Sequence, residues 1–444
     1  MDKGQELNTT ESAHSDPFYG KRRSSLRRQE SVDESVIKVL SQRRSDYDAW
    51  SLKHPITTTP HNSEIAYEIR MFTANHPGTV ILRYFLYKNP SLENNNLELG
   101  VYIFRDAKMD CIPLDWRHVI QAIQQWNETL KLTANPDTRI TELQAALCNS
   151  SEQLSQCLLK PIWKHIGRID QIQHLVIIPV EELFRVPFHI AFMPGEQIPL
   201  CAVVPLSFSV SAAAFVGRGR HLFRRQRVEH TDDLCALIVQ RGENDVSGKE
   251  LVNLNWDERH FHIAGNKKQL PDFIGSYQYV GSANQAGLEK LVQQKPEFFI
   301  YGGHGEYHNS YSILGPALIL EEEGSFLTQF DIAMGLRLPR NKLTLLGACV
   351  SGQGVNLGGG EVSGFLRAFI AAGCGAIGIT LWEVLDDEIA NSVRHLLNQA
   401  KKSADDPSSV FDVVQELHQY YKNTCSSLES VAKQIEACPF ALYL

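Results

Sequence analysis

The sequence predicts an α/β protein with a mostly parallel sheet and helices on both of its faces. Two observations support this fold class. In the second half of the chain, short apolar runs alternate with longer segments of helical periodicity. Two of the apolar runs, 298–301 and 343–347, end at glycines, which is typical of buried strands in parallel sheets. The chain has 444 residues, 43% of them hydrophobic, so it is long enough for two or three domains with large cores.

The first half is predicted to follow a polar tail and to mix strands with helices. We expect residues 1–63 to form a flexible polar and basic tail, and residues 64–217 to form an ordered half. Its expected strands are 79–87, 97–104 and 174–179, and its expected helices are 115–132 and 141–166. The first two strands should form a hairpin or meander, because the segment between them is rich in Asn. A loop at 180–192 should pack over the end of the third strand.

The second half, 233–444, is expected to follow a basic linker at 218–232. Its expected strands are 234–239, 298–301, 317–320, 343–347 and 375–381. Its expected helices are 284–294, 328–336, 363–372 and 387–400. Thr328, followed three residues later by Asp331, predicts a capped helix start.

Composition and charge exclude several functional classes. The net charge of −8 argues against a general nucleic-acid binder, whose surface would be basic. No apolar run approaches the roughly 20 residues of a membrane-spanning helix, so we expect no membrane association. The nine cysteines never form a CxxC pair, and no signal peptide is recognisable. This pattern favours a reducing cytoplasm over a disulfide framework or a zinc ribbon.

The polar tail contains one unusual feature, a concentration of Lys and Arg at 21–28 beside Ser24, Ser25 and Ser31. Such a cluster can be a phosphorylation site, a processing site or a dock for an anionic partner. The favoured alternative is a solvated tail, which is the more common case for charge runs in polar segments.

Cys349 and His304 are the candidate catalytic residues, because each follows the end of a predicted strand. Reactive groups in open α/β sheets lie just beyond the carboxyl ends of strands. A cysteine is more often a small buried residue than a nucleophile, but this one enters a glycine-rich loop. A nucleophilic thiolate needs a nearby base, and His304 can supply an imidazole. The amide of Gly305 is a candidate donor to an oxyanion.

Other chemistries fit these residues less well. His304 and His308 have a metal-binding helical spacing, but the flanking glycines disfavour a helix, so we expect no metal. The glycine-rich loop at 352–364 lacks the GK[ST] and GxGxxG patterns of nucleotide sites. Ser351 and Ser363 are not in a GxSxG motif, which disfavours a serine hydrolase.

Several short segments follow one another along the chain: Gly303-His304-Gly305, Gly347-Ala348-Cys349, Gly359-Gly360-Glu361, Phe369 with Ala372-Gly373, Leu381-Trp382 and Asp386-Asp387. In this order they resemble the CHAT domain, a caspase-like peptidase module. The resemblance covers most of the chain and implies a catalytic caspase-like half at 233–444, preceded by a smaller degenerate caspase-like half at 64–217. The tetratricopeptide repeats often attached to this domain are not recognisable in the sequence.

The resemblance also implies an activity and a specificity. The family has cysteine endopeptidases with a His and Cys dyad, which corresponds to His304 and Cys349. The chain is similar also to separase, in which an acid beyond a Leu-Trp segment helps to bind a basic P1 side chain. Asp386, with Glu383 as the second choice, is the candidate for that role. An alternative role for Asp386 is capping of the helix that follows.

The function expected from the sequence is thus regulated proteolysis of protein substrates in the cytoplasm, without a metal or organic cofactor. The resemblance points to immunity or cell death, with a gasdermin-like pore-former as a possible substrate and a protein partner as a possible activator. A different class of function remains open, in which a catalytically silent CHAT-type scaffold acts by protein binding. Labelling of Cys349 by an electrophilic peptide would discriminate between the two.

Overall fold

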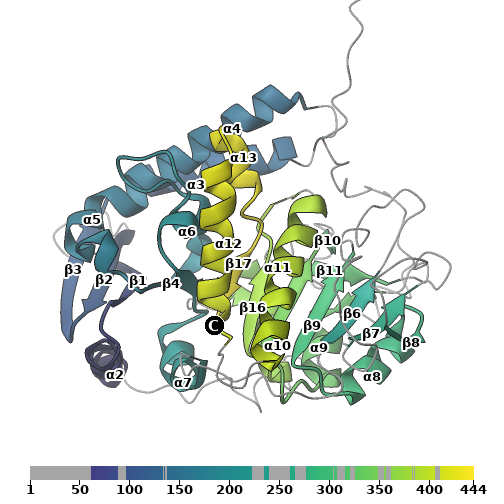
Figure 1. Ribbon diagram of the computed structural model, residues 1–444. Helices are drawn as coiled ribbons and strands as arrows, with labels where there is room; N and C mark the ends of the chain where they lie inside the picture. The colour runs from purple at the N-terminus through teal and green to yellow at the C-terminus, as the bar shows by residue number, and fades with distance from the viewer. Residues whose placement is uncertain are drawn as a thin grey trace, which may run out of the picture.

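A twelve-stranded sheet runs through both halves of the chain in the order β3-β2-β1-β4-β5-β17-β16-β13-β9-β6-β7-β8 (Figure 1). The computed structural model describes residues 62–88, 97–133, 135, 138–222, 235–239, 261–265, 277–303, 305–307, 316–320, 326–348, 355–356, 362–382, 384, 386–405 and 411–444. Eight of the eleven strand pairings described in this sheet are parallel, which confirms the predicted fold class. Residues 1–61 of the predicted tail lie outside the described residues.

Five strands come from the first half. They are β1 (Thr79–Lys88), β2 (Leu97–Arg105), β3 (Lys108–Leu114), β4 (His174–Ile178) and β5 (Leu206–Phe208). The predicted hairpin is confirmed, because β1 and β2 pair antiparallel with Tyr84 opposite Val101. Strand β3 was not predicted, and the reason is its position at the sheet edge, where most of its residues are exposed and no apolar alternation marks a strand.

Helices cover both faces of this part of the sheet. They are α2 (Asn62–Asn75), α3 (Trp116–Thr133), α4 (Ile140–Leu154), α5 (Lys160–Ile166), α6 (Leu200–Val203) and α7 (Ala212–Leu222). One π-helical turn, Ser155–Leu159, divides the helix predicted at 141–166. Alternate residues of β1 enter different cores: Val80 and Leu82 join the main core, whereas Ile81 packs in a second core with α2 and α7.

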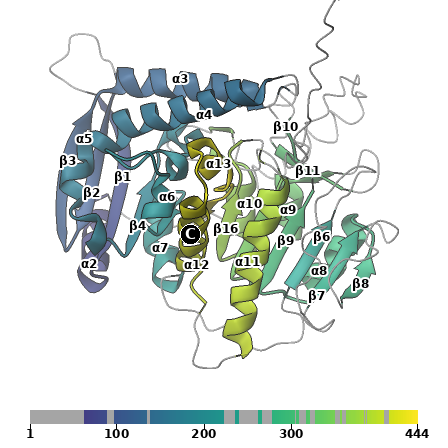
Figure 2. The same ribbon diagram turned by 45° about the horizontal axis from the view of Figure 1, so that its top comes forward.

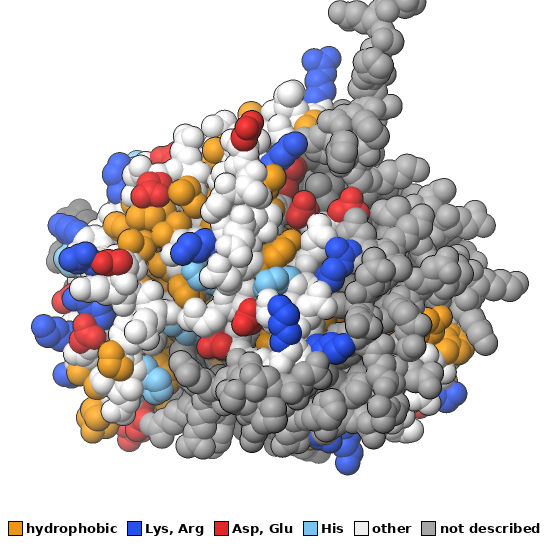
Figure 3. Space-filling view, in the orientation of Figure 1, with side chains coloured by type: hydrophobic (Ala, Val, Ile, Leu, Met, Phe, Trp, Pro, Cys, Tyr) orange, Lys and Arg blue, Asp and Glu red, His pale blue; other side chains and the backbone are white. Residues whose placement is uncertain are grey.

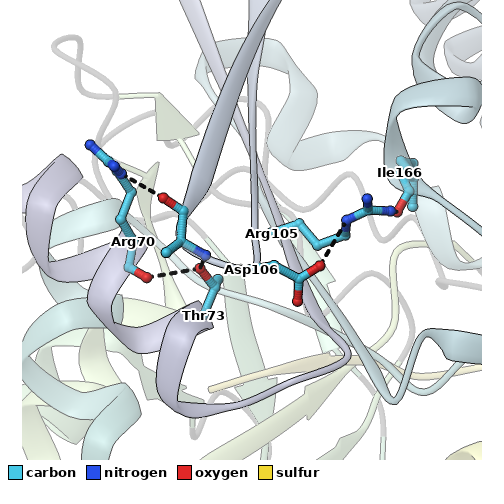
Figure 4. Close-up of polar contacts among 6 residues, drawn as sticks. Arg70, Thr73, Arg105, Asp106 and Ile166 are labelled. Atoms are coloured by element: carbon cyan, nitrogen blue, oxygen red, sulfur yellow. Dashed lines mark hydrogen bonds and ion pairs between the residues drawn. The ribbon is translucent and has the colours of Figure 1, made fainter.

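The turn between β2 and β3 is held by the helices around it (Figure 4). Asp106 and Ala107 adopt positive φ values of 49° and 62°. Arg70 of α2 donates from Nε to the carbonyl of Ala107 at 2.8 Å, and the Ala107 amide donates to Thr73 Oγ1 at 3.3 Å. Arg105 donates to the carbonyl of Ile166 at the end of α5, at 2.8 Å. These contacts stabilise a backbone conformation that L-residues rarely adopt.

The second half supplies the other seven strands of the large sheet. They are β6 (Cys235–Val239), β7 (Phe261–Gly265), β8 (Gln278–Gly281), β9 (Phe298–Gly302), β13 (Leu343–Gly347), β16 (Ala376–Ile379) and β17 (Ala441–Tyr443). Two small antiparallel sheets contain β10 (Gly305–Tyr307), β11 (Pro316–Ile319) and β12 (Phe326–Thr328), and β14 (Val355–Asn356) and β15 (Val362–Ser363). The predicted strands at 298–301 and 343–347 are therefore confirmed and lie side by side.

The helices of the second half are α8 (Gln285–Gln293), α9 (Gln329–Gly335), α10 (Phe365–Ala372), α11 (Asp386–Asp405), α12 (Val413–Ser427) and α13 (Val431–Glu436). The predicted cap of α9 is confirmed, since the Asp331 amide donates to Thr328 Oγ1 and Asp331 accepts from the Thr328 amide. Helices α11 and α12 lie side by side near the centre of the molecule in both ribbon views (Figures 1 and 2).

The C-terminal strand β17 joins the two halves. It pairs with β5 of the first half and with β16 of the second, and the rings of Phe208 and Tyr443 stack 5.1 Å apart. Arg218, near the end of α7, donates to the carbonyls of Cys374 and Gly375. Helix α7 ends at Leu222, so its last turn lies within the segment 218–232 that was expected to be a linker. The division of the chain at 218–232 stays a prediction.

Within the part of the chain that the structure describes, no helix is long and apolar enough to cross a membrane. Among the same described residues, no three His, Cys, Asp or Glu side chains are grouped so that they could hold a metal ion. On the face seen in Figure 3, acidic and basic side chains are interspersed rather than gathered by sign.

Candidate active site at the carboxyl ends of β9 and β13

Strands β9 and β13 are parallel neighbours that end together. Gly302, the last residue of β9, pairs with Gly347, the last residue of β13. His304 and Cys349 themselves lie outside the described residues, and each follows its paired glycine by two positions. The register therefore brings the two segments that lead to the predicted dyad to one edge of the sheet.

The order of the strands marks the same edge. Strand β9 has β13 on one side and β6 on the other. From β6 the chain proceeds outward through β7 and β8, and it then returns to β9 and proceeds outward in the opposite direction through β13 and β16. This reversal of strand order is where ligands bind in open α/β sheets, outside the carboxyl ends of the strands.

Gly347 allows helix α11 to approach the end of β13. A Cβ atom at this position would lie 2.8 Å from Cγ2 of Ile389 and 3.0 Å from the carbonyl oxygen of Tyr301. Real Cβ atoms essentially never come within 3.0 Å of another heavy atom, so the shorter of these distances requires a shift. The close packing of Ile389, in the first turn of α11, against the strand end therefore favours a glycine here.

The residue before Cys349 is held by a hydrogen bond that the sequence did not reveal. Thr380 donates from Oγ1 to the carbonyl oxygen of Ala348 at 2.5 Å. Both residues are 0% exposed. Thr380 directly follows β16, the neighbour of β13, so the contact joins two adjacent strand ends.

Trp382 fixes the segment between β16 and α11 to the first half. Its ring stacks on His189 with centroids 5.3 Å apart and meets Trp126 edge-on at 6.1 Å. Burial lowers the pKa of His189 to about 3, so this imidazole is neutral at pH 7. Both side chains are buried, which makes Trp382 a core residue that anchors the strand-end segment.

The residues on both sides of position 304 are attached to surrounding strands. Gly303 is buried after β9, and Gly305 is buried as the first residue of β10, opposite Leu318 of β11. The hydroxyl of Tyr301 donates to the carbonyl of Ile319 at 2.5 Å, which joins β9 to the sheet that contains β10. The candidate oxyanion donor Gly305 thus begins a strand next to the site edge, and its role stays a prediction.

The two candidate acids lie at the start of α11. Asp386 is its first helical residue, and Glu383 lies outside the described residues. Because Ile389 is one helical turn after Asp386, the packing of Ile389 on Gly347 brings the amino end of α11 next to the end of β13. This position suits a substrate-binding acid and a helix-capping acid equally.

Cys374, the other cysteine near the family-like segments, is unsuited to nucleophilic chemistry. Its side chain is buried, and burial raises the pKa of its thiol to about 12. A thiol with such a pKa is protonated at pH 7. Cys374 also precedes β16 and so lies at the amino end of that strand, away from the candidate site, which leaves Cys349 as the better candidate.

Comparisons with known proteins identify related folds. No curated protein matches the chain. The fold resembles two structures of the Saccharomyces cerevisiae separase–securin complex, with a TM-score of 0.50, 10% identity and coverage of 84% and 86% of this chain. The chain spans about 30% of the separase chain. The structure of the Arg-specific cysteine proteinase gingipain R gives a TM-score of 0.38, with 10% identity and 74% coverage of each chain.

A model of the CHAT domain family matches residues 149–415, which is more than half of the chain. The matched region contains β4, β9, β13, β16 and the start of α11, and so every segment that builds the candidate site. The chain belongs to the CHAT domain family and has its caspase-like α/β fold.

Proposed function

We propose that this chain is a cysteine endopeptidase that uses His304 and Cys349 to cleave protein substrates, with a preference for a basic P1 residue. The observation that supports it best is the pairing of Gly302 with Gly347. A histidine and a cysteine follow these paired glycines at the same offset, at the sheet edge where open α/β proteins bind their ligands. Membership of a caspase-like family is consistent with this chemistry.

The proposed mechanism needs only side chains and backbone amides. Cys349 Sγ attacks the scissile carbonyl carbon, and the thiol proton passes to His304. The amides of Gly305 and Cys349 donate hydrogen bonds to the oxyanion that forms. When the C–N bond breaks, His304 returns the proton to the leaving amine. Water, deprotonated by His304, then hydrolyses the thioester and regenerates the thiol.

Asp386 is the proposed selector for a basic side chain, with Glu383 as the second choice. The amino end of a helix stabilises an ionised carboxylate, and Asp386 begins the 20-residue helix α11. The contact between Ile389 and the position of Gly347 keeps that helix end beside the strand that leads to Cys349. A carboxylate there would attract Arg or Lys at P1.

Regulation by a protein partner is also proposed. Separase appears in the matching structures as a complex with securin. For this chain, the proposal is that a protein partner controls access to the dyad. The family resemblance favours a cytoplasmic role in immunity or cell death and a gasdermin-like substrate.

The test is cleavage of peptides with Arg, Lys, Leu or Asp at P1 by the wild type, Cys349→Ala and Cys374→Ala. We expect Cys349→Ala to lower kcat/KM by at least about a thousandfold, because the nucleophile is lost. Cys374→Ala should remain active, since that thiol is buried and protonated. Undiminished cleavage by Cys349→Ala would refute the dyad, and a wild-type preference for Asp would refute the proposed specificity. A wild type that binds protein partners without cleaving any peptide would indicate a scaffold.

A further inference from the structure

The hydrogen bond from Thr380 to Ala348 acts on the peptide group that joins Ala348 to Cys349. The carbonyl of that peptide belongs to Ala348, and its N–H belongs to Cys349. Thr380 Oγ1 donates to the carbonyl oxygen at 2.5 Å, with neither residue exposed to solvent. A donor at this short distance fixes the direction of the carbonyl and withdraws electron density from the amide.

The direction of the carbonyl determines that of the N–H. A trans peptide is planar, so its N–H points opposite to its C=O. Strand β13 lies between β16 and β9, and Thr380 belongs to the β16 side. The Ala348 carbonyl accepts its hydrogen bond from the β16 side, and the N–H of the same planar peptide is held antiparallel to that carbonyl.

We propose that Thr380 is a positioning residue that aims and polarises the Cys349 amide as an oxyanion donor. The inference rests on the proposed peptidase function and adds to it a residue that does not touch the substrate. Thr380 is well placed for this role because its own position is fixed on both sides. The strand β16 precedes it, and the buried ring of Trp382 follows it.

A merely structural role for this hydroxyl is the competing explanation, since any buried carbonyl is stabilised by a donor. The chain offers a matched control for that role. Thr344, on β13, is also 0% exposed, and it donates from Oγ1 to Asn341 Oδ1 at 3.1 Å. Its hydrogen bond lies near the amino end of the same strand, away from the candidate site.

The kinetic test compares Thr380→Val, Thr380→Ser and Thr344→Val with the wild type in the full chain. Thr380→Val keeps the shape of the side chain and removes the donor, so we expect kcat to fall by roughly 10- to 100-fold, with KM unchanged. Alkylation of Cys349 by iodoacetamide should keep its rate, because that reaction develops no oxyanion. Thr380→Ser should restore kcat to within about threefold, and Thr344→Val should leave kcat unchanged despite a similar loss of thermal stability.

A second measurement does not depend on activity. Selective 15N labelling of cysteine gives one amide signal for each of the nine cysteines, and Cys349→Ser identifies the signal of residue 349 by its disappearance. The 15N shift of an amide responds to the hydrogen bond accepted by the preceding carbonyl. We expect Thr380→Val to move the Cys349 signal, and Thr380→Ser and Thr344→Val to leave it in place.

The outcomes separate the two proposals. If the wild type cleaves peptides through Cys349 and Thr380→Val keeps kcat within twofold, the positioning role is refuted and the peptidase proposal stands. If the wild type is inactive, the peptidase proposal fails, and the amide signal still decides whether Thr380 polarises the 348–349 peptide. An unmoved signal in Thr380→Val refutes the inference in either case. Equal losses of kcat in Thr380→Val and Thr344→Val would show a structural role only.

Discussion

The two halves contribute parallel strands to one sheet, but the residues that follow their strands differ in size. In the first half, β4 is followed by two 3₁₀ turns, Glu181–Arg185 and Phe188–Ile190, whose apolar side chains are buried. In the second half, β9 and β13 end at Gly302 and Gly347, and the next described residue in each case is the small Gly303 or Ala348. Bulky side chains therefore fill the space after β4, whereas small residues follow β9 and β13.

This difference shows why chemistry is proposed at one strand end only. Phe188, after β4, packs against Tyr84 and Phe208, so the chain itself occupies the space beyond the strand. The first half has a histidine in that segment, His189, but it is buried and its pKa is lowered to about 3. A buried imidazole with this low pKa is part of the hydrophobic core, and it cannot act as a base near pH 7.

The largest effect among the following predictions concerns Asp386. Asp386→Asn keeps the size of the side chain and removes its charge, so cleavage after Arg or Lys should fall by about 100-fold in kcat/KM. Cleavage after Leu should change little. The measurement is the ratio of kcat/KM for matched Arg and Leu peptides.

Asp387→Asn is the control for that prediction, because it changes the adjacent carboxylate in the first turn of α11. A purely helix-capping role for Asp386 would lower thermal stability and leave the Arg-to-Leu ratio at its wild-type value. That result would transfer the selector role to Glu383 or remove it from this segment.

A smaller effect is expected at the glycine that ends β13. Gly347→Ala places a methyl group 2.8 Å from Ile389 Cγ2, so overpacking should lower the free energy of unfolding by about 1–3 kcal/mol. Urea denaturation measures this change. Gly335→Ala, at the end of α9, introduces a methyl group with no heavy atom within 4 Å and should be neutral or stabilising by up to about 1 kcal/mol. Equal effects of the two variants would contradict the proposed packing of α11 on the strand end.

The smallest effect concerns pH and the buried histidines of the first half. Burial lowers the pKa of His174 and of His189 to about 3 in the folded protein, from 6.5. Between these values the unfolded chain binds protons that the folded chain excludes, so stability falls as pH falls below 6.5. Each histidine should contribute about 1 kcal/mol of that loss between pH 7.5 and 5.5.

Urea midpoints at these two pH values measure the loss, and His189→Gln should reduce it by about half if the two histidines dominate. An unchanged pH dependence in His189→Gln would show that the folded protein accommodates the charged imidazole. The packing around His189 would then admit more water than the burial of its side chain indicates.

The local patterns of the sequence predicted the elements that build the candidate site. The runs that became β9 and β13 are apolar and end at glycines, and the Thr328–Asp331 pair caps α9 as expected. Helix α12 was missed although it carried a signal. Asp412 caps it by accepting from the amides of Val414 and Gln415, and its buried residues recur at helical spacing.

Other features depend on contacts between residues far apart in the sequence. Strand β17 has three residues, and its central position follows from pairing with Phe208, more than 200 residues earlier. The contact between Thr380 and Ala348 spans 32 residues and requires β13 and β16 to be neighbours. Periodicity within a segment contains no information on such pairings.

The most direct test of the account is the map of cysteine labelling by a peptide electrophile with Arg at P1. The wild type should be modified at Cys349 and not at Cys111, the exposed cysteine of β3 in the first half. His304→Ala should lose the Cys349 adduct, whereas iodoacetamide should still modify Cys111 in both proteins. Modification of Cys111 in preference to Cys349, or a Cys349 adduct that forms equally fast in His304→Ala, would contradict a dyad at the ends of β9 and β13.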